Sequence, residues 1–493
     1  MSFFPDQLEC NPGAVADVTA CTEAVLKPDF TAFTALALAL ATGLGAFCLT
    51  AVLGFLLRGR LTRPQRTAAS PSASVASAVG RRGLQGEEAP FPEVSVLQQF
   101  LKQAQLHPEA EVARAVGVSS LSRQDLEAAA RSLAQLLQSG NEGEDAIGEG
   151  GRQGSLVAIF LEPGPRQVVA ILGIWLAGKA WTPLDRQSPF QRVAEMLQLV
   201  KPFGLVCDET AFLDASDDSL RVVCADPRDS RGVEWTVWTR AEKMTKSLKS
   251  EAVTELKLTA DSVAQVIYTS GSTGVPKGVV YSHSRLAHSS HFFGEQCGVG
   301  AGTKCLQRTA MIWSVYRHEI YPVLCKGGTI IFHGQPPGAQ GQPAGEPLRM
   351  AQVIESEAVN LFVTTPTVLE LVLDASAGLP SAPLGSLRHV VCMGEALPRR
   401  LAQSFYDQVP GACLWNFYGS TETENATFEV PKPTAEPWAA MADTFVPAGR
   451  PQPRTSVYLL DPSSTEEVTS GEICFGGVIS TGYWNRPDLT SQR

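Results

Sequence analysis

Residues 266–278 read VIYTSGSTGVPKG, a short apolar strand that runs into hydroxyl and glycine residues and ends at Lys277 and Gly278. Glycines let backbone N–H groups converge without Cβ clashes, the hydroxyls add donors, and Lys277 supplies a cation. The pattern therefore predicts a polyphosphate-binding loop, as opposed to a flexible Gly/Ser turn. The candidate phosphate-binding residues are Thr269, Ser270, Gly271, Ser272, Thr273 and Gly274. The loop is not a Walker-type P-loop, because its Gly-to-Lys spacing differs and Gly278, not Ser or Thr, follows the lysine.

Strand-like and helix-like segments alternate on both sides of this loop. Helices are expected at residues 125–137 and 168–177, and strands at 156–161, 204–207 and 264–268. Alternation on this scale predicts an α/β fold with largely parallel sheets. The stretch 334–346, GQPPGAQGQPAGE, is too rich in Gly and Pro for a helix or strand interior and is expected to be a surface insertion.

Four further blocks follow one another in an order that identifies a family. They are LSRQDL at 121–126, AGKAWTPLD at 177–185, NFYGSTE at 416–422 and GEICFGGVISTGY at 471–483. Together with the 266–278 loop they resemble the adenylate-forming superfamily of acyl-CoA synthetases, amino-acid adenylation domains and luciferases. The resemblance covers roughly residues 121–493, and Ser420 departs from the proline usual at that position.

The resemblance implies the fold of the main domain, and composition along the chain adds the N-terminal divisions. The expected fold is the large N-terminal domain of these enzymes, with two α/β subdomains and a partial small β-barrel, preceded by one transmembrane helix. The expected divisions are a non-cytosolic tail (1–29), the transmembrane helix (30–57), an Ala/Ser/Pro/Gly-rich linker (58–93) and an adenylation domain truncated at its C-terminal end (94–493).

Residue roles carry over from the family only at matching positions. Lys277 and Thr421 are expected to contact the phosphates of ATP, and Glu422 is expected to hold Mg²⁺, which prefers hard oxygen ligands. The expected catalytic residues are thus Lys277, Thr421 and Glu422. The resemblance also implies an adenine-binding set, which consists of Gly394, Glu395, Ala396, Asn416, Tyr418 and Gly419.

The segment MIWSVYRHE at 311–319 bears on the substrate. Its aromatic residues fit either a core or a substrate pocket, so Trp313, Ser314 and Tyr316 are pocket candidates. Amino-acid adenylation domains usually read F-D-x-S-x-x-E here, and the Asp pairs with the substrate ammonium group. A gapless match that ends at Glu319 places Ser314 at the Asp position. Since a buried cation without a counter-charge is costly, a plain carboxylic acid is favoured over an α-amino acid.

The implied reaction is attack of a carboxylate on the α-phosphorus of ATP, which gives an acyl-adenylate and pyrophosphate. The acyl group then passes to a thiol, either CoA or the phosphopantetheine of an acyl-carrier protein. ATP and Mg²⁺ are the expected cofactors, and no protein nucleophile is needed. The alternative is a catalytically incomplete nucleotide-binding remnant with a regulatory or scaffold role.

Composition excludes one class of partner. The 493-residue chain has a formal net charge of −10, which argues against a broad footprint on nucleic acid. Its 11 cysteines are scattered, without a Cys-x-x-Cys pair, and are expected to be mostly reduced. The cluster His283, His288 and His291 does not have metal-ligand spacing.

Residues 30–57 contain no charged side chain over 28 positions, more than the roughly 20 needed to cross a bilayer. A cleaved signal peptide is the competing interpretation, but its apolar part is normally shorter. Arginines follow the segment and acidic residues precede it, which predicts a single-pass membrane protein whose catalytic domain is cytosolic. The arginines are Arg58, Arg60, Arg63 and Arg66.

The C-terminal end carries a further expectation. In the family the chain continues to a Y-R-T-G-D segment, a hinge and a small domain with a second catalytic lysine, whereas this sequence stops at Arg493. The small domain normally closes over the nucleotide and excludes water. The chain as written is therefore expected to complete the two-step reaction inefficiently, either as a fragment or truncated gene product, or as a remnant.

Overall fold

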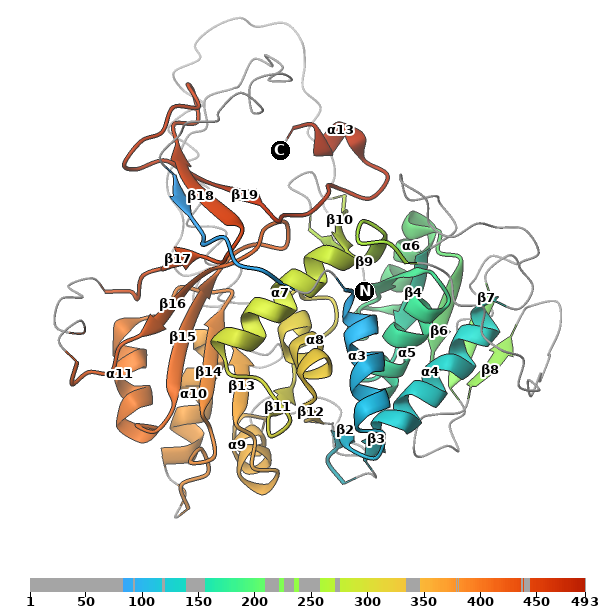
Figure 1. Cartoon of the computed structure of the whole chain (residues 1–493), viewed down its shortest axis with the longest axis horizontal. Coiled ribbons are helices and arrows are strands. Elements are labelled where there is room, and N and C mark those ends of the chain that lie inside the picture. The colour runs from blue at the N-terminus through green and yellow to red at the C-terminus, as the bar shows by residue number, and fades with distance from the viewer. Residues whose placement is uncertain are drawn as a thin grey trace, which may run out of the picture. The chain divides into compact units, whose positions relative to one another are not determined.

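The computed structural model describes the chain from residue 83 onward, with gaps (Figure 1). The described residues are 83–91, 94–117, 120–138, 156–208, 221–225, 235–238, 258–270, 275–333, 346–377, 379, 381–435, 438 and 444–492. All structural statements below concern these residues.

A seven-stranded sheet carries the 266–278 loop. Its order is β10-β9-β5-β4-β6-β7-β8, parallel in the centre and antiparallel at both edges. The strands are β4 (Leu156–Phe160), β5 (Ala180–Pro183), β6 (Gly204–Cys207), β7 (Arg221–Ala225), β8 (Trp235–Trp238), β9 (Val263–Thr269) and β10 (Lys277–Ser282). Its connecting helices are α5 (Pro165–Leu176) and α6 (Phe190–Val200), and α4 (Arg123–Gln138) packs on α5.

A second sheet has nine strands in the order β17-β16-β15-β14-β13-β11-β12-β2-β3. Its strands are β2 (Glu111–Ala115), β3 (Leu121–Ser122), β11 (Lys304–Gln307), β12 (Thr329–Phe332), β13 (Leu361–Thr364), β14 (His389–Met393), β15 (Cys413–Tyr418), β16 (Ala426–Val430) and β17 (Arg450–Pro451). Within this sheet, the neighbouring strands β2, β12, β11, β13, β14 and β15 pair in parallel. The strands β3, β16 and β17, toward the two edges, pair antiparallel with their neighbours. The expected α/β fold with largely parallel sheets is therefore confirmed.

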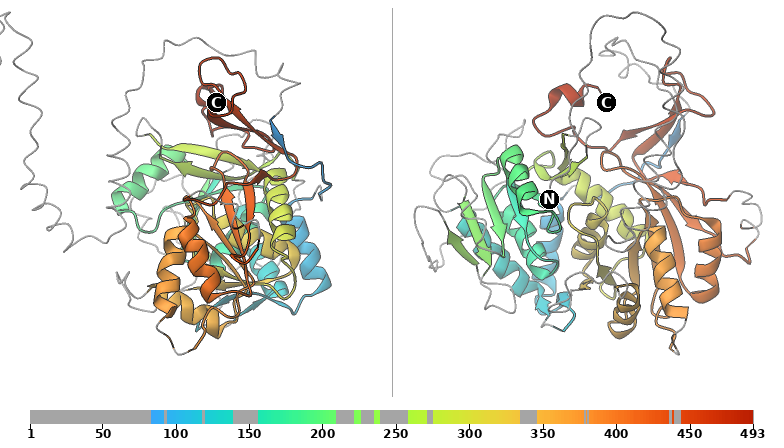
Figure 2. Two further views of the ribbon diagram at one scale, coloured as in Figure 1. Left: turned by 90° about the vertical axis from the view of Figure 1, so that its left-hand side faces the viewer. Right: turned by 180° about the vertical axis from the view of Figure 1, so that it is seen from behind.

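Helices fill the space between the two sheets and cover the second. The helices α3 (Val96–Leu106), α7 (His283–Gln296) and α8 (Tyr316–Lys326) pack on one another, and Figures 1 and 2 agree in placing α7 and α8 between the sheets. One apolar core runs from strands of the first sheet through these helices to strands of the second. A separate core lies under α9 (Glu346–Ser356), α10 (Pro366–Ala377) and α11 (Arg399–Gln408).

A small antiparallel sheet completes the described part. Its order is β1-β18-β19, formed by β1 (Leu84–Gln85), β18 (Thr455–Leu460) and β19 (Glu472–Gly477), and a short helix α13 (Pro487–Thr490) follows. β1 falls within the stretch expected to be a linker and pairs with β18, with Leu84 opposite Val457. The expected insertion at 334–346 lies outside the described residues except at Glu346, where α9 begins.

The expected transmembrane helix requires a correction. Among the described residues, no helix is both long enough and apolar enough to cross a bilayer. Residues 30–57, on which the expectation rested, lie outside that part of the chain. A run of uncharged residues is typical of a membrane-spanning helix but does not establish one. A preceding transmembrane helix is therefore not supported as part of the fold, and neither are the single-pass localisation and the membrane partner that depended on it.

Candidate functional site

The hairpin β9–β10 holds the two ends of the polyphosphate loop together. Thr269 and Lys277 face each other in its register, and the Thr269 hydroxyl donates a hydrogen bond to the Lys277 carbonyl at 3.4 Å. A Cβ at Gly278 would come within 2.7 Å of Val266 Cγ1, so the glycine lets the strands approach. Ser270 is exposed. The other loop candidates lie outside the described residues: Gly271, Ser272, Thr273 and Gly274.

Three segments that are far apart in sequence meet beside this hairpin. Residues 482–484 run along β10, where Gly482 accepts a backbone hydrogen bond from Val280 at 3.0 Å. This contact brings the Tyr483 ring under Lys277, whose Nζ lies 5.7 Å from the ring centroid. The Tyr483 hydroxyl in turn donates to Glu422 Oε1 at 2.9 Å. Two of the expected catalytic residues, Lys277 and Glu422, thus share one neighbour.

The third expected catalytic residue, Thr421, is fixed through its backbone. Its carbonyl accepts hydrogen bonds from the Tyr281 hydroxyl at 2.6 Å and from Arg285 Nη2 at 3.1 Å. Its own hydroxyl points to Ser314 Oγ, 3.5 Å away. The loop after β15 therefore links the expected phosphate-binding residues to one of the pocket candidates.

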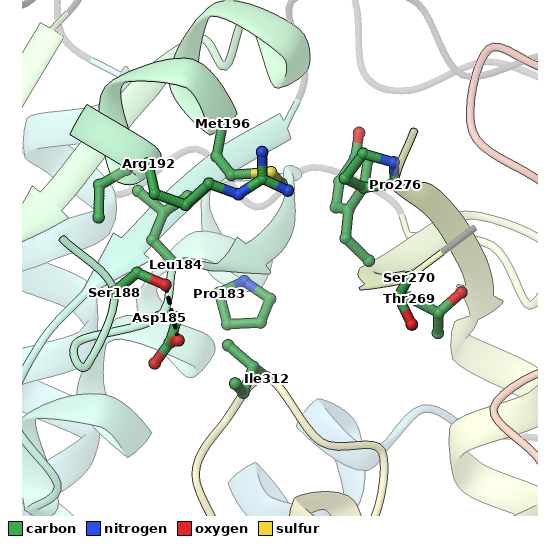
Figure 3. A pocket seen from close by; sticks show the side chains of 12 residues that line it. Pro183, Leu184, Asp185, Ser188, Arg192, Met196, Thr269, Ser270, Pro276 and Ile312 are labelled. Carbon is green, nitrogen blue, oxygen red and sulfur yellow. Dashed lines mark hydrogen bonds between the residues drawn. The ribbon is translucent and has the colours of Figure 1, made fainter. Parts of the chain in front are cut away.

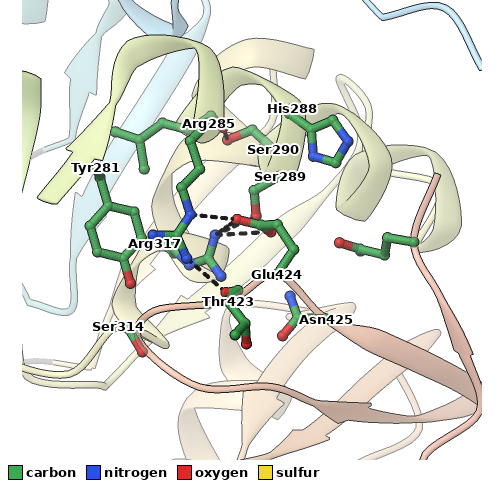
Figure 4. A network of polar contacts seen from close by, with 12 residues as sticks. Tyr281, Arg285, His288, Ser289, Ser290, Ser314, Arg317, Thr423, Glu424 and Asn425 are labelled. Atoms are coloured by element: carbon green, nitrogen blue, oxygen red, sulfur yellow. Dashed lines mark hydrogen bonds and ion pairs between the residues drawn. The ribbon is translucent and has the colours of Figure 1, made fainter. Parts of the chain in front are cut away.

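Beneath this loop lies a buried ion-pair network that sequence reasoning missed (Figure 4). Glu424 accepts from Arg285 Nε at 2.9 Å and from Arg317 Nη1 at 3.2 Å, and the three side chains are 0%, 1% and 4% exposed, respectively. Arg285 also donates to the Thr423 carbonyl at 2.7 Å, and Arg317 to Ser289 Oγ at 2.6 Å. We call Arg285, Arg317 and Glu424 the buried triad.

The triad holds its carboxylate in the charged form. Burial by itself raises the pKa of Glu424, but the neighbouring guanidiniums of Arg317 and Arg285 more than offset this and leave the pKa below its ordinary value. In the sequence, Arg285 and Arg317 each appear as one charged residue within a helix-forming segment, and Glu424 appears as a second acidic residue two positions after Glu422. Nothing local says which of these side chains is buried.

The expected adenine-binding residues gather at one edge of the second sheet. The parallel strands β14 and β15 end side by side, with Met393 opposite Phe417, so Gly394–Ala396 and Tyr418–Gly419 follow at the same edge. The Tyr418 ring is 42% exposed and stacks on Phe475 at 6.3 Å between centroids. Gly394 has a φ of +86°, which favours glycine, and Ala396 is exposed.

Two members of that set already have partners within the chain. Glu395 accepts hydrogen bonds from the backbone and hydroxyl of Thr367, at 3.0 and 2.6 Å. Asn416 is buried and donates to the carbonyls of Val446 and Pro447, at 3.4 and 2.8 Å. The Asn416 amide hydrogens therefore hold the backbone near residues 446–447, which leaves its side-chain oxygen as the atom that could face adenine.

The substrate-pocket candidates separate into three environments. Trp313 is 64% exposed, whereas Tyr316 is 2% exposed, lies in the main core and directs its hydroxyl to Gln167 Oε1 at 3.3 Å. Tyr316 is thus a core residue and does not line a surface pocket. Ser314 is half-buried, next to Thr421, and is the candidate that the fold brings to the expected catalytic residues.

A cavity of about 190 Å³ opens beside the polyphosphate loop (Figure 3). Thr269, Ser270 and Pro276 form the wall on the loop side, and Asp185 and Arg192 lie on the opposite wall. Asp185 accepts a hydrogen bond from Ser188 Oγ at 2.8 Å. The cavity therefore has hydroxyls on one side and a guanidinium together with a carboxylate on the other.

The buried histidine His283, at the start of α7, gives a prediction about stability in acid. Burial lowers the pKa of His283 to about 4, and neither ring nitrogen has a hydrogen-bond partner among the described residues. The unfolded chain therefore takes up a proton below about pH 6.5 that the folded chain refuses until about pH 4. We expect the free energy of unfolding to fall as the pH is lowered from about 6.5 to about 4. This residue should contribute on the order of 1–3 kcal/mol to the fall.

The measurement is urea unfolding of the wild type and of His283→Phe across pH 4 to 7. The phenyl ring keeps the edge-on packing against Trp175 and removes the titration, so the variant should lose less stability on acidification. Burial raises the pKa of Glu319 to about 7, so this residue makes the folded state more stable as the pH is lowered, opposite to His283. Both proteins contain Glu319, so its contribution cancels when their pH dependences are subtracted. Equal pH slopes for both proteins would contradict the prediction.

Comparison with known proteins now decides the family. A family model described as "AMP-binding enzyme" matches residues 100–484. The chain belongs to this family. Similar proteins include tyrocidine synthase 3 of Brevibacillus parabrevis, 28% identical over 80% of this chain and 6% of that protein. Phosphinothricin tripeptide synthetase PhsB of Streptomyces viridochromogenes is 32% identical over 69% of this chain and 26% of that protein.

Solved structures agree with this assignment. A crystal structure of the nonribosomal peptide synthetase FmoA3 in an AMPPNP-bound form has a TM-score of 0.66 and 25% identity, and the match covers 82% of this chain and 40% of that one. The N-terminal subdomain of Klebsiella oxytoca NpsA, in complex with 3-hydroxybenzoyl-AMSN, shares the fold with a TM-score of 0.62 at 22% identity, over 81% and 91% of the two chains. The chain spans only a small part, 6% and 26%, of the length of tyrocidine synthase 3 and PhsB.

Proposed function

We propose that this chain binds ATP and activates a carboxylic acid as its acyl-adenylate. The observation that carries the proposal is the meeting of Lys277, Tyr483 and Glu422, from three separate segments, next to the β9–β10 hairpin. A cation, a hydroxyl and a carboxylate beside a hydroxyl-rich loop can together bind a polyphosphate and its counter-ion. Membership of the AMP-binding family supports the same activity.

The proposed division of labour follows the geometry. Lys277 neutralises charge on the phosphates, and the Thr421 hydroxyl, whose backbone is fixed by Tyr281 and Arg285, donates to the α-phosphate. The substrate carboxylate lies near Ser314, from which it attacks the α-phosphorus in line. Catalysis then consists mainly of positioning and charge neutralisation, because the chemistry needs no protein nucleophile.

Glu422 suits the expected Mg²⁺ site. Mg²⁺ is commonly held by one or two carboxylates together with substrate phosphates, and no cluster of three acidic, His or Cys ligands occurs among the described residues. Glu422 Oε1 accepts from Tyr483, and its second carboxylate oxygen has no hydrogen bond within the described part of the chain. When bound, the ion would neutralise charge on the phosphates. Glu422 would hold it, and the hydrogen bond from Tyr483 orients Glu422.

The adenine base of ATP is proposed to lie at the edge formed by Gly394–Ala396 and Tyr418–Gly419. The exposed Tyr418 ring offers a stacking surface, and the side-chain oxygen of Asn416 can accept from the base. The proposed acceptor of the acyl group is a thiol, either CoA or the phosphopantetheine of a carrier. A carrier is favoured, because the relatives named above are peptide synthetases.

Pyrophosphate exchange tests the proposal. The purified chain is incubated with ATP, Mg²⁺ and labelled pyrophosphate, together with fatty, aryl, hydroxy and amino acids in turn. Label should enter ATP only when a suitable acid is present. Nucleotide binding without exchange for any acid would instead support the alternative, a protein that holds ATP or AMP without turnover.

A further inference from the structure

The buried triad carries more positive than negative charge. Two guanidiniums share one carboxylate, and all three side chains are buried. Arg285 Nη1 and Arg317 Nε find no hydrogen-bond acceptor among the described residues. The triad therefore contributes an uncompensated positive charge to the protein interior, where water screens it poorly.

Among the described residues, no second carboxylate pairs with the two arginines. The Tyr281 ring faces Arg285, with 4.0 Å between the guanidinium carbon and the ring centroid, but it is neutral and leaves the net charge unchanged. Burial, followed by repulsion from Arg317, keeps the pKa of His318 well below its ordinary value, and burial also lowers the pKa of His288. Both rings are thus neutral near pH 7. The buried carboxyl of Glu319 is turned elsewhere, toward Thr309 and the backbone of Arg308.

The charge lies directly below the proposed reaction centre. Arg285 Nη2 donates to the Thr421 carbonyl at 3.1 Å, and the Thr421 hydroxyl lies 3.5 Å from Ser314 Oγ. If Thr421 contacts the α-phosphate, as proposed above, the substrate carboxyl group lies beside Thr421 and the α-carbon is one bond further. A charged group on the α-carbon would thus enter the field of the triad.

We propose that the buried triad selects the substrate by charge: it admits carboxylic acids whose α-carbon bears a hydrogen or hydroxyl group and disfavours those that bear an ammonium group. This inference rests on the proposed function and names its substrate class. An ammonium group at the α-carbon would be repelled by the triad, and Ser314, which stands where amino-acid adenylation domains usually carry an aspartate, offers it no counter-charge. A hydroxyl group of the same size carries no charge and suffers no such penalty.

Arg317 is the specificity-determining residue that can be tested separately. It contacts Glu424 and Ser289, whereas Arg285 is the one of the two arginines that donates to carbonyls of the 421–424 loop. Arg317→Gln lowers the triad's net charge from +1 to 0 and leaves the contacts of Arg285 in place. Arg317→Lys keeps the charge and is the matched control.

The experiment measures binding, so it does not depend on turnover. Glycolyl- and glycyl-sulfamoyladenosine differ only by a hydroxyl in place of an ammonium group and carry no side chain that could be too large for the pocket. Their dissociation constants for the full chain, for Arg317→Gln and for Arg317→Lys are determined by calorimetry. Circular dichroism confirms that each variant is folded.

The wild type should bind the glycolyl compound at least about ten times more tightly than the glycyl compound, because a like charge in a poorly screened site costs more than one power of ten. Arg317→Gln should shrink that ratio several-fold, and Arg317→Lys should preserve it. Equal or tighter binding of the glycyl compound by the wild type would overturn the inference, as would an unchanged ratio in Arg317→Gln. Should Arg317→Gln fail to fold, the wild-type ratio still decides.

Failure of the proposed function gives a different result. In that case neither compound binds, and MgATP does not bind either, so both proposals fall. Preferred binding of the glycyl compound together with MgATP binding would leave the proposed function standing and remove only the charge selection.

Discussion

Lys277→Ala should lower the rate of pyrophosphate exchange by about ten to a thousandfold, the scale expected when one electrostatic contact is lost from such a site. Lys277 is the cation that the β9–β10 hairpin presents beside Glu422 and Tyr483. Glu422→Ala should cause a loss of similar size and should also weaken the dependence on Mg²⁺. Initial exchange rates at saturating and limiting MgATP separate an effect on turnover from one on binding.

The control is Lys102→Ala, which removes an exposed lysine from helix α3. This variant should exchange pyrophosphate at the wild-type rate. If Lys277→Ala and Glu422→Ala also kept wild-type exchange and MgATP affinity, the phosphate-binding site would have to lie elsewhere in the molecule.

Glu424→Ala should destabilise the protein by about 3–5 kcal/mol, because it leaves two buried guanidiniums without their counter-charge. The decrease in the free energy of unfolding should be much larger than the decrease caused by replacing an exposed acidic residue with alanine. Urea unfolding near pH 7 measures it, and Glu370→Ala is the matched control, since Glu370 pairs with Arg400 on the surface of α10. Exposed pairs contribute about 0–1 kcal/mol.

A triple variant separates the charge effect from simple loss of packing. Combining Glu424→Leu with Arg317→Leu leaves Arg285 as the only charged member of the triad, and a third change, Arg285→Met, removes all three charges. The triple variant should recover much of the stability lost in Glu424→Ala, because apolar replacements for a buried ion network are often neutral or stabilising. A triple variant no more stable than Glu424→Ala would show that the triad matters for its shape and not for its charge.

Local patterning predicted the elements that carry the site. The run of apolar residues before Thr269 is strand β9, the segment 204–207 is strand β6, and the helix expected at 125–137 is α4 with one or two more residues at each end. These succeed because backbone preference and hydrophobic period act over a few residues. The expected membrane-spanning helix is not supported as part of the fold: no helix among the described residues meets the requirement, and residues 30–57 lie outside them.

The sequence by itself determined the family, the parallel α/β architecture and the motif that places Lys277, Thr421 and Glu422 among the candidates. Only the tertiary structure decided that Tyr483 joins Lys277 to Glu422 and that Tyr316 is a core residue. It also decided that Arg285, Arg317 and Glu424 form one buried network. The physical reason is that the sequence specifies a side chain's charge and size, whereas its burial and its partners depend on segments that lie 61 to 139 residues away in these contacts. The packing of the two sheets around α7 and α8 brings those segments together.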